Sequence, residues 1–251
     1  MKYGIIGGTG IYDLDNKLTE KTIKTPYGPV EIQTINIDED EIIFLPRHGK
    51  GHQVLPHQVN YQGNIWALKE YGIQTILATA AVGSLRENLK IGDAVVLKDF
   101  IDFTQNRKNT FFDGKKGEIA HVSMADPYCQ DLRNLLKKQG LSQEATYVCT
   151  QGPRFETAAE INFYAQIGAD VVGMTNVPEV VLAKELGLCY ACVGIITNMA
   201  TGLTTTEATG EEIIEAVNQK KTDLTQIFIK IFKEHQKTEK TCSCQTALIK
   251  V

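Results

Sequence analysis

The protein is a chain of 251 residues, of which 43% are hydrophobic and 22% are charged, as in ordinary globular proteins. A chain of this length can bury a large core, and α/β folds of this size are often single domains. We therefore expect one domain over residues 1–251, with 235–251 as a C-terminal tail. The 26 basic and 30 acidic residues give a formal net charge of −4. This balance disfavours nucleic acid as a partner, because nucleic-acid-binding domains usually carry a basic excess.

Nothing in the sequence suggests export or membrane insertion. Met1–Ile6 leads directly into a short apolar run, without the basic segment and small-residue cleavage site of a signal peptide. No apolar stretch approaches the ~20 residues that a transmembrane helix needs. We therefore expect a cytoplasmic protein with no membrane partner.

Six cysteines occur in the chain, and in a reducing cytoplasm we expect most of them to be free thiols that pack as small hydrophobic side chains. Cys189 and Cys192 form a C-x-x-C motif inside an apolar run. No second C-x-x-C exists to complete a zinc site, which favours buried thiols over a metal or redox pair. Cys242 and Cys244 form a C-x-C motif in a polar segment. They are either an exposed pair without a role or a labile disulfide that clips the C-terminus.

Strand-like and helix-like segments alternate along the chain. In chain order, the sequence predicts strands over residues 3–6, 30–37, 41–45, 75–80, 94–103, 145–150, 170–173 and 189–197. It predicts helices over residues 60–71, 127–139, 157–167, 179–186 and 211–234. Apolar strands separated by helices indicate an α/β fold with a central, mixed, twisted sheet that helices cover on both faces. In such sheets ligands bind beyond the carboxyl ends of the strands.

Two of these strand ends carry residues that suit an anion. The glycine-rich loop 7–10 can turn backbone N–H groups toward an anion, and Thr9 adds a hydroxyl donor. The loop does not fit a dinucleotide-binding fingerprint, because Asp13 occupies the third glycine position, and no Gly-Lys-Ser/Thr follows as in a P-loop. Arg47 and His48 follow a later strand and can clamp a phosphate. Together, the two segments favour a phosphate site over a surface arginine beside a structural histidine.

Four further strand ends carry small or polar residues. Residues 79–84 allow close approach of the backbone to a ligand, and residues 152–156 offer an aromatic ring and a carboxylate before a helix. The helix dipole alone also favours a carboxylate at that place. Residues 173–179 lead from a strand into a helix, and Asn198 ends the last apolar strand, where an asparagine is usually a cap. Each signal is weak alone, but six at the strand ends of one sheet indicate a binding site.

At these positions the sequence resembles the trimeric purine nucleoside phosphorylase family, and it is most similar to the methylthioadenosine phosphorylase branch. The resemblance rests on G-G-T-G-I, P-R-H-G, A-V-G-S-L-R-E, G-P-R-F-E-T-A-A-E and G-M-T-N-V-P-E-V-V-L-A-K-E, in the family's order between Tyr3 and Glu234. It implies a nucleoside phosphorylase fold and cleavage of purine nucleosides by inorganic phosphate. Phosphate is then a co-substrate, with no cofactor and no metal. The resemblance also implies a homotrimer or a dimer of trimers.

The resemblance further implies which residues form the site. Those implied to surround phosphate are Thr9, Arg47, His48, Ala80, Ala81 and Thr175. Those implied to contact base and sugar are Phe155, Glu156, Met174, Asn198, Met199 and Ala200. His48 and Asn198 are the expected catalytic residues, and His121 is expected to reach into a neighbouring subunit's site. The methylthioadenosine branch has Thr at the position of Ala80, so one hydrogen bond to phosphate is expected to be missing here.

Two positions bear on the purine base. Family members specific for adenine have Ser and Asp at the positions of Glu156 and Asn198, whereas members that cleave inosine and guanosine have Glu and Asn, as this chain does. The chemistry agrees, because an ionised Glu156 accepts the N1–H of a 6-oxopurine, while Asn198 donates to O6 or accepts a protonated N7. Mismatched buried polar groups can discriminate by factors on the order of 10⁴. We therefore predict a preference for 6-oxopurine nucleosides.

The sequence does not determine which group the substrate carries at the 5′ end of its sugar. Nucleoside-specific members place a His near the position of Gly210 and methylthio-specific members place an apolar residue there. Gly210 offers neither, so S-methyl-5′-thioinosine and S-methyl-5′-thioadenosine remain alternative substrates. An inactive nucleoside- or phosphate-binding protein on the same fold is a further alternative. The Arg47–His48 pair disfavours a hydrolytic nucleosidase, and Asp13 disfavours a dinucleotide-dependent oxidoreductase.

Overall fold

The computed structural model describes residues 1–7, 18–51, 53–114, 118–204 and 209–250. Within these ranges, no helix is both long and apolar enough to cross a membrane.

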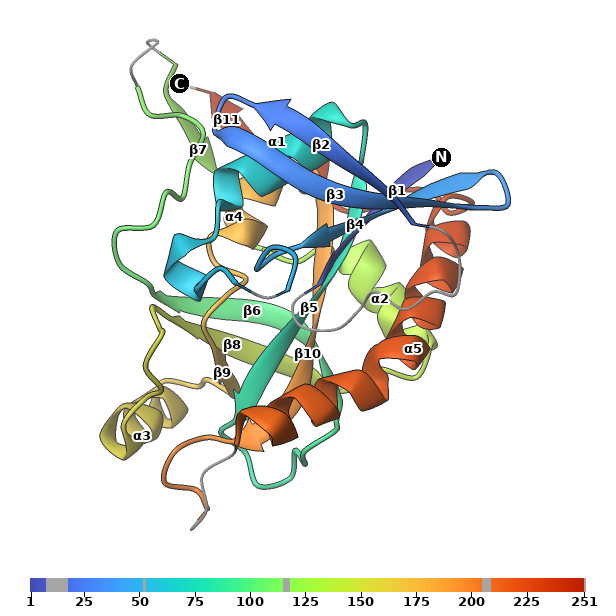
Figure 1. The fold of residues 1–251 in the computed structure, drawn as a ribbon. Helices are drawn as coiled ribbons and strands as arrows, with labels where there is room; N and C mark the ends of the chain where they lie inside the picture. The colour runs from blue at the N-terminus through green and yellow to red at the C-terminus, as the bar shows by residue number, and fades with distance from the viewer. Residues whose placement is uncertain (8–17, 52, 115–117, 205–208, 251) are drawn as a thin grey trace.

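A nine-stranded mixed sheet forms the centre of the molecule (Figure 1). Its strands are β1 (Lys2–Gly7), β2 (Thr19–Thr25), β3 (Gly28–Ile37), β4 (Asp40–Pro46), β5 (Thr75–Ser84), β6 (Ala94–Phe103), β8 (Glu144–Thr150), β9 (Val171–Gly173) and β10 (Cys189–Met199). They lie in the order β10-β6-β8-β9-β5-β1-β4-β3-β2. Only β2 was not predicted, because this edge strand is mostly exposed and rich in Lys, Thr and Glu, so it lacks an apolar pattern.

The sheet closes on itself over five strands. β10 pairs in parallel with β5, beginning at Cys189 opposite Thr75, and antiparallel with β6. The pairings of β6 with β8, β8 with β9 and β9 with β5 complete the ring. The predicted mixed sheet is thus confirmed. The closure depends on pairing between segments that are distant in the sequence, which the pattern of apolar residues does not reveal.

Helices cover both faces of the sheet, as predicted. On one face α1 (Tyr61–Glu70) and α4 (Glu179–Glu185) pack against Ile6, and on the other α2 (Gln130–Lys138) and α5 (Gly210–His235) pack in the core that contains Ile5. The two isoleucines divide between the cores because successive side chains of a strand point to opposite faces. The short helix α3 (Ala158–Gln166) closes a third, smaller core over β8 and β9.

Local sequence sets the ends of these helices. Asn60 caps α1 by accepting from the N–H of Gly63 at 3.0 Å, and Thr157 forms a capping box with Glu160 at the start of α3. The predicted helix over 127–139 begins later, at Gln130, because Cys129 has a non-helical backbone (φ −50°, ψ 116°).

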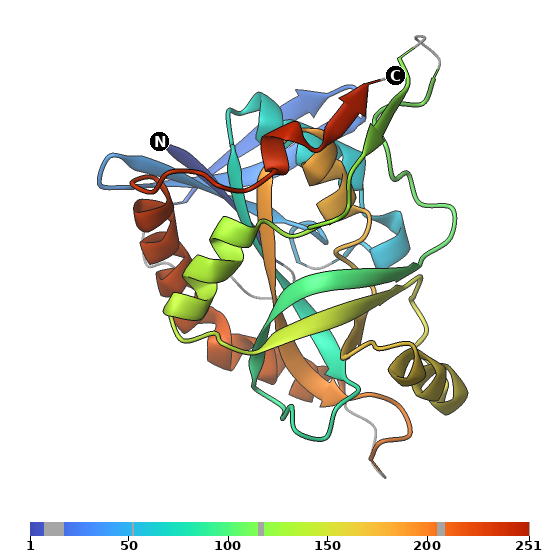
Figure 2. The ribbon, with the colours of Figure 1, turned by 180° about the vertical axis from the view of Figure 1, so that it is seen from behind.

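The segment expected as a tail packs onto the molecule (Figure 2). After α5 it passes α2, forms a short 3₁₀ turn, η2 (Cys244–Thr246), and ends in β11 (Leu248–Lys250). β11 pairs antiparallel with β7 (Ala120–Val122) in a second, two-stranded sheet. Neither strand was predicted, since three residues are too few to show a periodic pattern. A further 3₁₀ turn, η1 (Pro56–Gln58), precedes α1.

Candidate active site

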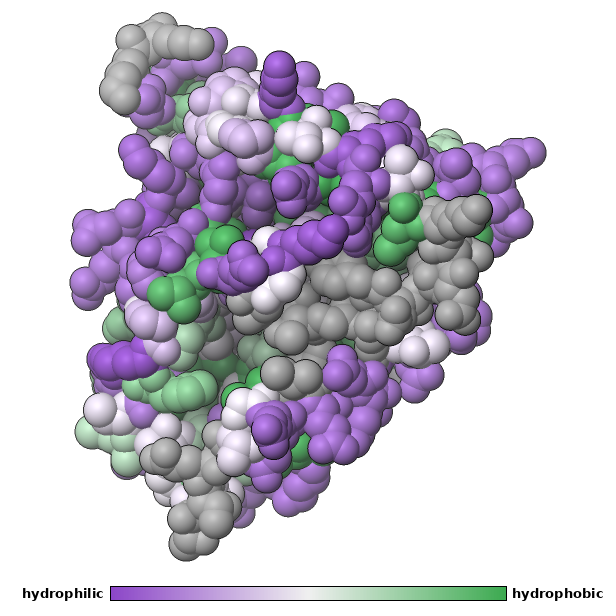
Figure 3. All heavy atoms as spheres, viewed as in Figure 1, coloured by the Kyte–Doolittle hydropathy of each residue, from purple (hydrophilic) through white to green (hydrophobic). Residues whose placement is uncertain are grey.

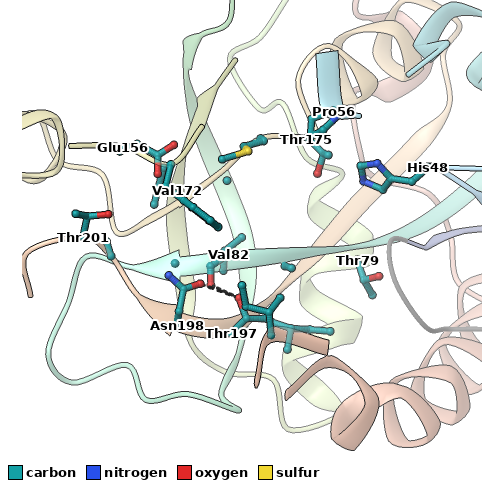
Figure 4. Close-up of a pocket in the computed structure, with 18 of the residues that line it drawn as sticks. His48, Pro56, Thr79, Val82, Glu156, Val172, Thr175, Thr197, Asn198 and Thr201 are labelled. Atoms are coloured by element: carbon teal, nitrogen blue, oxygen red, sulfur yellow. Dashed lines mark hydrogen bonds between the residues drawn. The ribbon is translucent and has the colours of Figure 1, made fainter. Parts of the chain in front are cut away.

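A cavity of about 240 Å³ lies where several strands of the main sheet end (Figure 4). Its walls come from the ends of β4, β5, β9 and β10, from the loop before α3 and from the first turn of α5. This is where an open or closed α/β sheet is expected to bind its ligands. The predicted site residues that line the cavity are Arg47, His48, Ala81, Phe155, Glu156, Met174, Thr175, Asn198 and Ala200.

One predicted phosphate-site residue, Ala80, does not contribute its side chain to this cavity. Ala80 points into the core shared with α1 and α4, because it alternates along β5 with Thr79 and Ala81, which do line the cavity. Thr9 lies outside the described residues. Gly7, the last described residue before that segment, accepts with its carbonyl from the N–H of Arg47 at 3.0 Å.

Three other predicted residues also lie away from the cavity. Met199 lines a second hollow next to α5. Gly210 is the first residue of α5 and is exposed, with open space where a side chain would project. Ile213, one turn further along the helix, lines the main cavity instead and was not predicted. His121 is exposed on β7.

Arg47 is held by a buried carboxylate. Its Nε and Nη2 donate to the two carboxylate oxygens of Glu179 at 2.7 and 2.6 Å, and its Nη1 donates to the carbonyl of Thr79 at 2.8 Å. The side chains of Arg47 and Glu179 are 1% and 0% exposed. Burial alone would lower the pKa of Arg47, but the charge and hydrogen bonds of Glu179 outweigh it and raise the pKa well above its ordinary value. These bonds use three of the five guanidinium N–H donors, which leaves two for an anion.

Glu179 in turn ends a buried chain of hydrogen bonds. The hydroxyl of Tyr190 donates to Glu179 at 2.6 Å, the amide of Asn176 donates to Tyr190 at 2.8 Å, and Tyr128 donates to Asn176 at 2.5 Å. Burial raises the pKa of both tyrosines well above the ordinary value, so they stay protonated donors. Asn176 has φ 75°, which asparagine tolerates better than most residues. The chain therefore fixes the loop between β9 and α4, from which Thr175 faces the cavity.

Hydrogen bonds to neighbouring protein groups orient both His48 and Thr175. Nδ1 of His48 lies 2.8 Å from the carbonyl of Val54, and because a carbonyl only accepts, Nδ1 carries a proton in this bond. The backbone N–H of Thr175 donates to the hydroxyl of Tyr147 at 3.1 Å, and its carbonyl accepts from the same hydroxyl at 2.6 Å. In Figure 4 both residues lie at the same end of the cavity.

Glu156 and Asn198 both lie on the opposite side of the view in Figure 4. Thr150 Oγ1 donates to Oε1 of Glu156 at 2.6 Å, and Glu156 is only 8% exposed. Asn198 Oδ1 accepts from the hydroxyl of Thr197 at 2.9 Å, and its Nδ2 donates to the following carbonyl at 3.0 Å. Gly83 leaves room for this amide, because a Cβ there would lie 3.2 Å from Nδ2.

Arg107 is a site-organising residue that the sequence did not reveal. Its Nη1 donates to the carbonyl of Val177 at 2.6 Å, and its Nη2 donates to the carbonyls of Gln151 and Met174, each at 2.9 Å. One guanidinium thus ties the loop after β8 to the loop after β9. Its only signal in the sequence is its position shortly after the strand over 94–103. Thr150 and Tyr190 were likewise not predicted as site residues.

The fold and this site place the chain in a known class of proteins. Residues 2–233 match the family model described as the phosphorylase superfamily, so the chain belongs to this family, and the resemblance seen in the sequence motifs is confirmed.

Individual relatives are similar over almost the whole chain. A protein of Dictyoglomus turgidum named probable 6-oxopurine nucleoside phosphorylase is 47% identical over 257 residues, which cover 99% of this chain and 97% of that protein. A protein of Methanothermobacter thermautotrophicus named probable S-methyl-5′-thioinosine phosphorylase is 45% identical, with coverage of 98% and 88%. A solved structure of methylthioadenosine phosphorylase from Schistosoma mansoni in complex with adenine matches with a TM-score of 0.87 and 32% identity, covering 95% of this chain and 93% of that one.

Proposed function

We propose that this protein is a nucleoside phosphorylase that cleaves 6-oxopurine nucleosides reversibly with inorganic phosphate, releasing the free base and ribose 1-phosphate. The observation that carries the proposal is that a carboxylate, Glu156, and a carboxamide, Asn198, line one side of a cavity that has His48 on the other side and is also lined by Arg47. The name of the Dictyoglomus relative supports the same substrate class.

The Glu156–Asn198 pair suits a 6-oxopurine. Thr150 occupies one oxygen of Glu156, and the other can accept the N1–H of hypoxanthine or guanine and the 2-amino group of guanine. Asn198 can turn its amide from the Met199 carbonyl to O6, or accept a protonated N7 with its carbonyl oxygen. Adenine N1 is an acceptor, so it would face the carboxylate as a second acceptor, and this mismatch weakens binding of adenine nucleosides.

Phosphate binds, in this proposal, at the end that holds Arg47, His48 and Thr175, with Thr9 completing the site. Arg47 contributes its two remaining N–H donors. Glu179 fixes the plane of this guanidinium and offsets its charge. A phosphate oxygen then attacks C1′ of the ribose as the bond from C1′ to N9 of the purine breaks. Fixing the two reactants at attack distance removes up to ~7–11 kcal/mol of barrier at the limit. The phosphate dianion also stabilises the positive charge that develops on the sugar, and Asn198 stabilises the departing base.

S-methyl-5′-thioinosine is the second candidate substrate, and one observation favours it. The apolar side chain of Ile213 lines the cavity from the first turn of α5, whereas Gly210 offers neither a donor nor a wall. An apolar side chain suits a methylthio group better than a hydroxyl. The name of the Methanothermobacter relative fits this substrate.

We also infer that the protein is a homotrimer, alone or as a dimer of trimers. Exposed apolar side chains group beside the cavity and along α3, toward the lower left of Figure 3. They are Phe103 at 38%, Phe155 at 60%, Phe163 at 48% and Ile167 at 41% exposure. Such a group on a soluble enzyme marks an interaction surface. The exposed His121 would then complete a neighbouring subunit's site. Light scattering should give a mass of about three or six chains of 27.8 kDa, and a monomer would contradict this inference.

The test of the function is release of purine from inosine, guanosine, S-methyl-5′-thioinosine and S-methyl-5′-thioadenosine, each with and without phosphate. We expect phosphate-dependent cleavage of the 6-oxopurine substrates, with methylthioadenosine slower by a factor on the order of 10²–10⁴. A higher kcat/KM for methylthioinosine than for inosine would select the second candidate. Preferential cleavage of methylthioadenosine, or release without phosphate, would refute the proposal.

The variant Asn198→Asp tests the base pocket separately from the phosphate site. A carboxylate at this position repels O6 but accepts the 6-amino group of adenine. We expect the ratio of adenosine to inosine cleavage to rise, while the KM for phosphate changes little. An unchanged ratio would show that Asn198 does not read the base.

A further inference from the structure

We propose that Cys129, Cys189, Cys242 and Cys244 form a tetrahedral Zn²⁺ site that fixes the C-terminal segment to the main sheet. These residues come from three separate segments: the residue before α2, the first residue of β10, and the tail after α5. Their four sulfur atoms all lie within 4.8 Å of one another. Three of the cysteines are buried, the fourth is half-buried, and all are free thiols.

The spacing of the sulfurs fits this metal ion. With Zn–S bonds of about 2.3 Å, a regular tetrahedron has sulfur–sulfur edges of about 3.8 Å. Cys189 Sγ and Cys242 Sγ lie 3.7 Å apart, so this edge already has the length that a bound ion requires. The remaining edges are at most 4.8 Å, so each needs to contract by no more than about 1 Å to close around an ion. Four thiolates in a tetrahedron are a donor set typical of zinc.

The C-x-x-C motif does not act as a unit in this cluster. Cys189 and Cys192 are three residues apart on β10, so their side chains point to opposite faces of the sheet. Cys189 lies in the core with α2 and α5, whereas Cys192 lies in the core with α1 and α4. A zinc site therefore does not need a second C-x-x-C motif, because the other ligands come from Cys129 and the C-x-C motif of the tail.

A buried positive charge beside the cluster is an independent observation that indicates a negative charge on the sulfur atoms. Lys184 is 2% exposed, and its Nζ lies 3.9 Å from Cys244 Sγ and 2.6 Å from the carbonyl of Asp126. Across the described parts of the chain, no carboxylate lies within ion-pair distance of this ammonium group. A buried charge without a counter-ion is costly. Zn²⁺ with four thiolates carries a net charge of −2, which supplies that counter-ion.

Other groups hold the tail in position for the ion. The carboxylate of Asp131, in the first turn of α2, accepts from the backbone N–H of Thr241 at 2.9 Å and of Cys242 at 3.1 Å. It also accepts from the hydroxyl of Thr241 at 2.6 Å. These bonds orient the C-x-C motif next to Cys129. Outer contacts of this kind keep metal ligands in place.

The site has a structural role in this proposal. Four protein ligands leave no open position for substrate, as in closed zinc sites that stabilise a fold. Beyond Cys244 the chain continues into β11, whose Ile249 pairs with His121 on β7. The metal therefore anchors the strand that supports His121.

The first experiment measures metal in the intact enzyme, purified under reducing conditions without chelators. We expect about one zinc ion per chain, lost in Cys242→Ser and in Cys244→Ser. Cys192→Ser is the matched control, because this buried cysteine lies on the same strand but outside the cluster, and it should retain the zinc. Removal of zinc with a chelator should lower the melting temperature, and added Zn²⁺ should restore it.

A second experiment does not depend on variants that fold. The unmodified, reduced, metal-free protein is titrated with Co²⁺, and tetrahedral thiolate coordination gives intense visible absorption that Zn²⁺ then abolishes. Two results would overturn the proposal. One is a reduced protein that takes up neither ion in stoichiometric amount. The other is a pair of disulfides among the four cysteines, found by peptide mapping of protein whose free thiols are alkylated at cell lysis, before any reductant is added.

Discussion

Glu179→Gln tests the idea that Arg47 depends on its buried partner. The pair is almost fully excluded from solvent, and the substitution leaves the guanidinium charge buried without a counter-ion. Removing one partner of a buried ion pair costs about 3–5 kcal/mol. Glutamine keeps one acceptor oxygen for the guanidinium, so we expect the lower end of this range. For a chain of this size that loss lowers the melting temperature by roughly 6–12 °C.

The assay is urea unfolding combined with steady-state kinetics. A second variant, Arg47→Met with Glu179→Leu, removes both charges. Its stability should return to within about 1 kcal/mol of the natural chain, because the unpaired charge is gone. Its phosphorolysis should still be lost, because no guanidinium remains to hold phosphate.

Two results would refute this reasoning. If Glu179→Gln unfolds at the same urea concentration as the natural chain, the buried charge does not depend on Glu179. If the double variant is as unstable as the single one, the loss comes from packing and not from an unpaired charge.

Two other predictions concern the carboxylates of Glu156 and Glu185. Thr150→Val removes the hydroxyl that orients Glu156, a bond to a charged group worth about 1.5–3 kcal/mol. The kcat/KM for inosine should fall roughly 10–100-fold and recover in Thr150→Ser, and an unchanged kcat/KM would count against the orienting role. Burial raises the pKa of Glu185 above 4.5, although its carboxylate accepts from the N–H of Phe111. Between pH 4.5 and the raised pKa, Glu185 therefore keeps its proton in the folded state and loses it in the unfolded state. The free energy of unfolding should fall as pH rises through this range. The free energy of unfolding should fall less over this pH range in Glu185→Gln. Urea unfolding that gives parallel pH profiles for the variant and the natural chain would contradict this prediction.

Local patterns in the sequence determined the order and type of most elements. The apolar runs predicted eight of the nine strands of the main sheet, and the capping residues Asn60 and Thr157 mark helix starts that the structure also has. These signals are readable because they act between neighbours in the chain: side chains alternate along strands and repeat along helices. Residues at predicted strand ends, such as His48 and Asn198, therefore line the cavity.

The tertiary structure decided which distant groups meet. No spacing in the sequence pairs Arg47 with Glu179, brings Arg107 to two site loops, or joins Cys129 and Cys189 to the tail. Each of these contacts depends on how β5, β10 and the helices around them pack, because interactions between remote segments form only when the chain closes large loops. The apolar patterns thus determined that the chain builds a sheet with polar strand ends, and only the packing of that sheet decided which charges, loops and thiols act together.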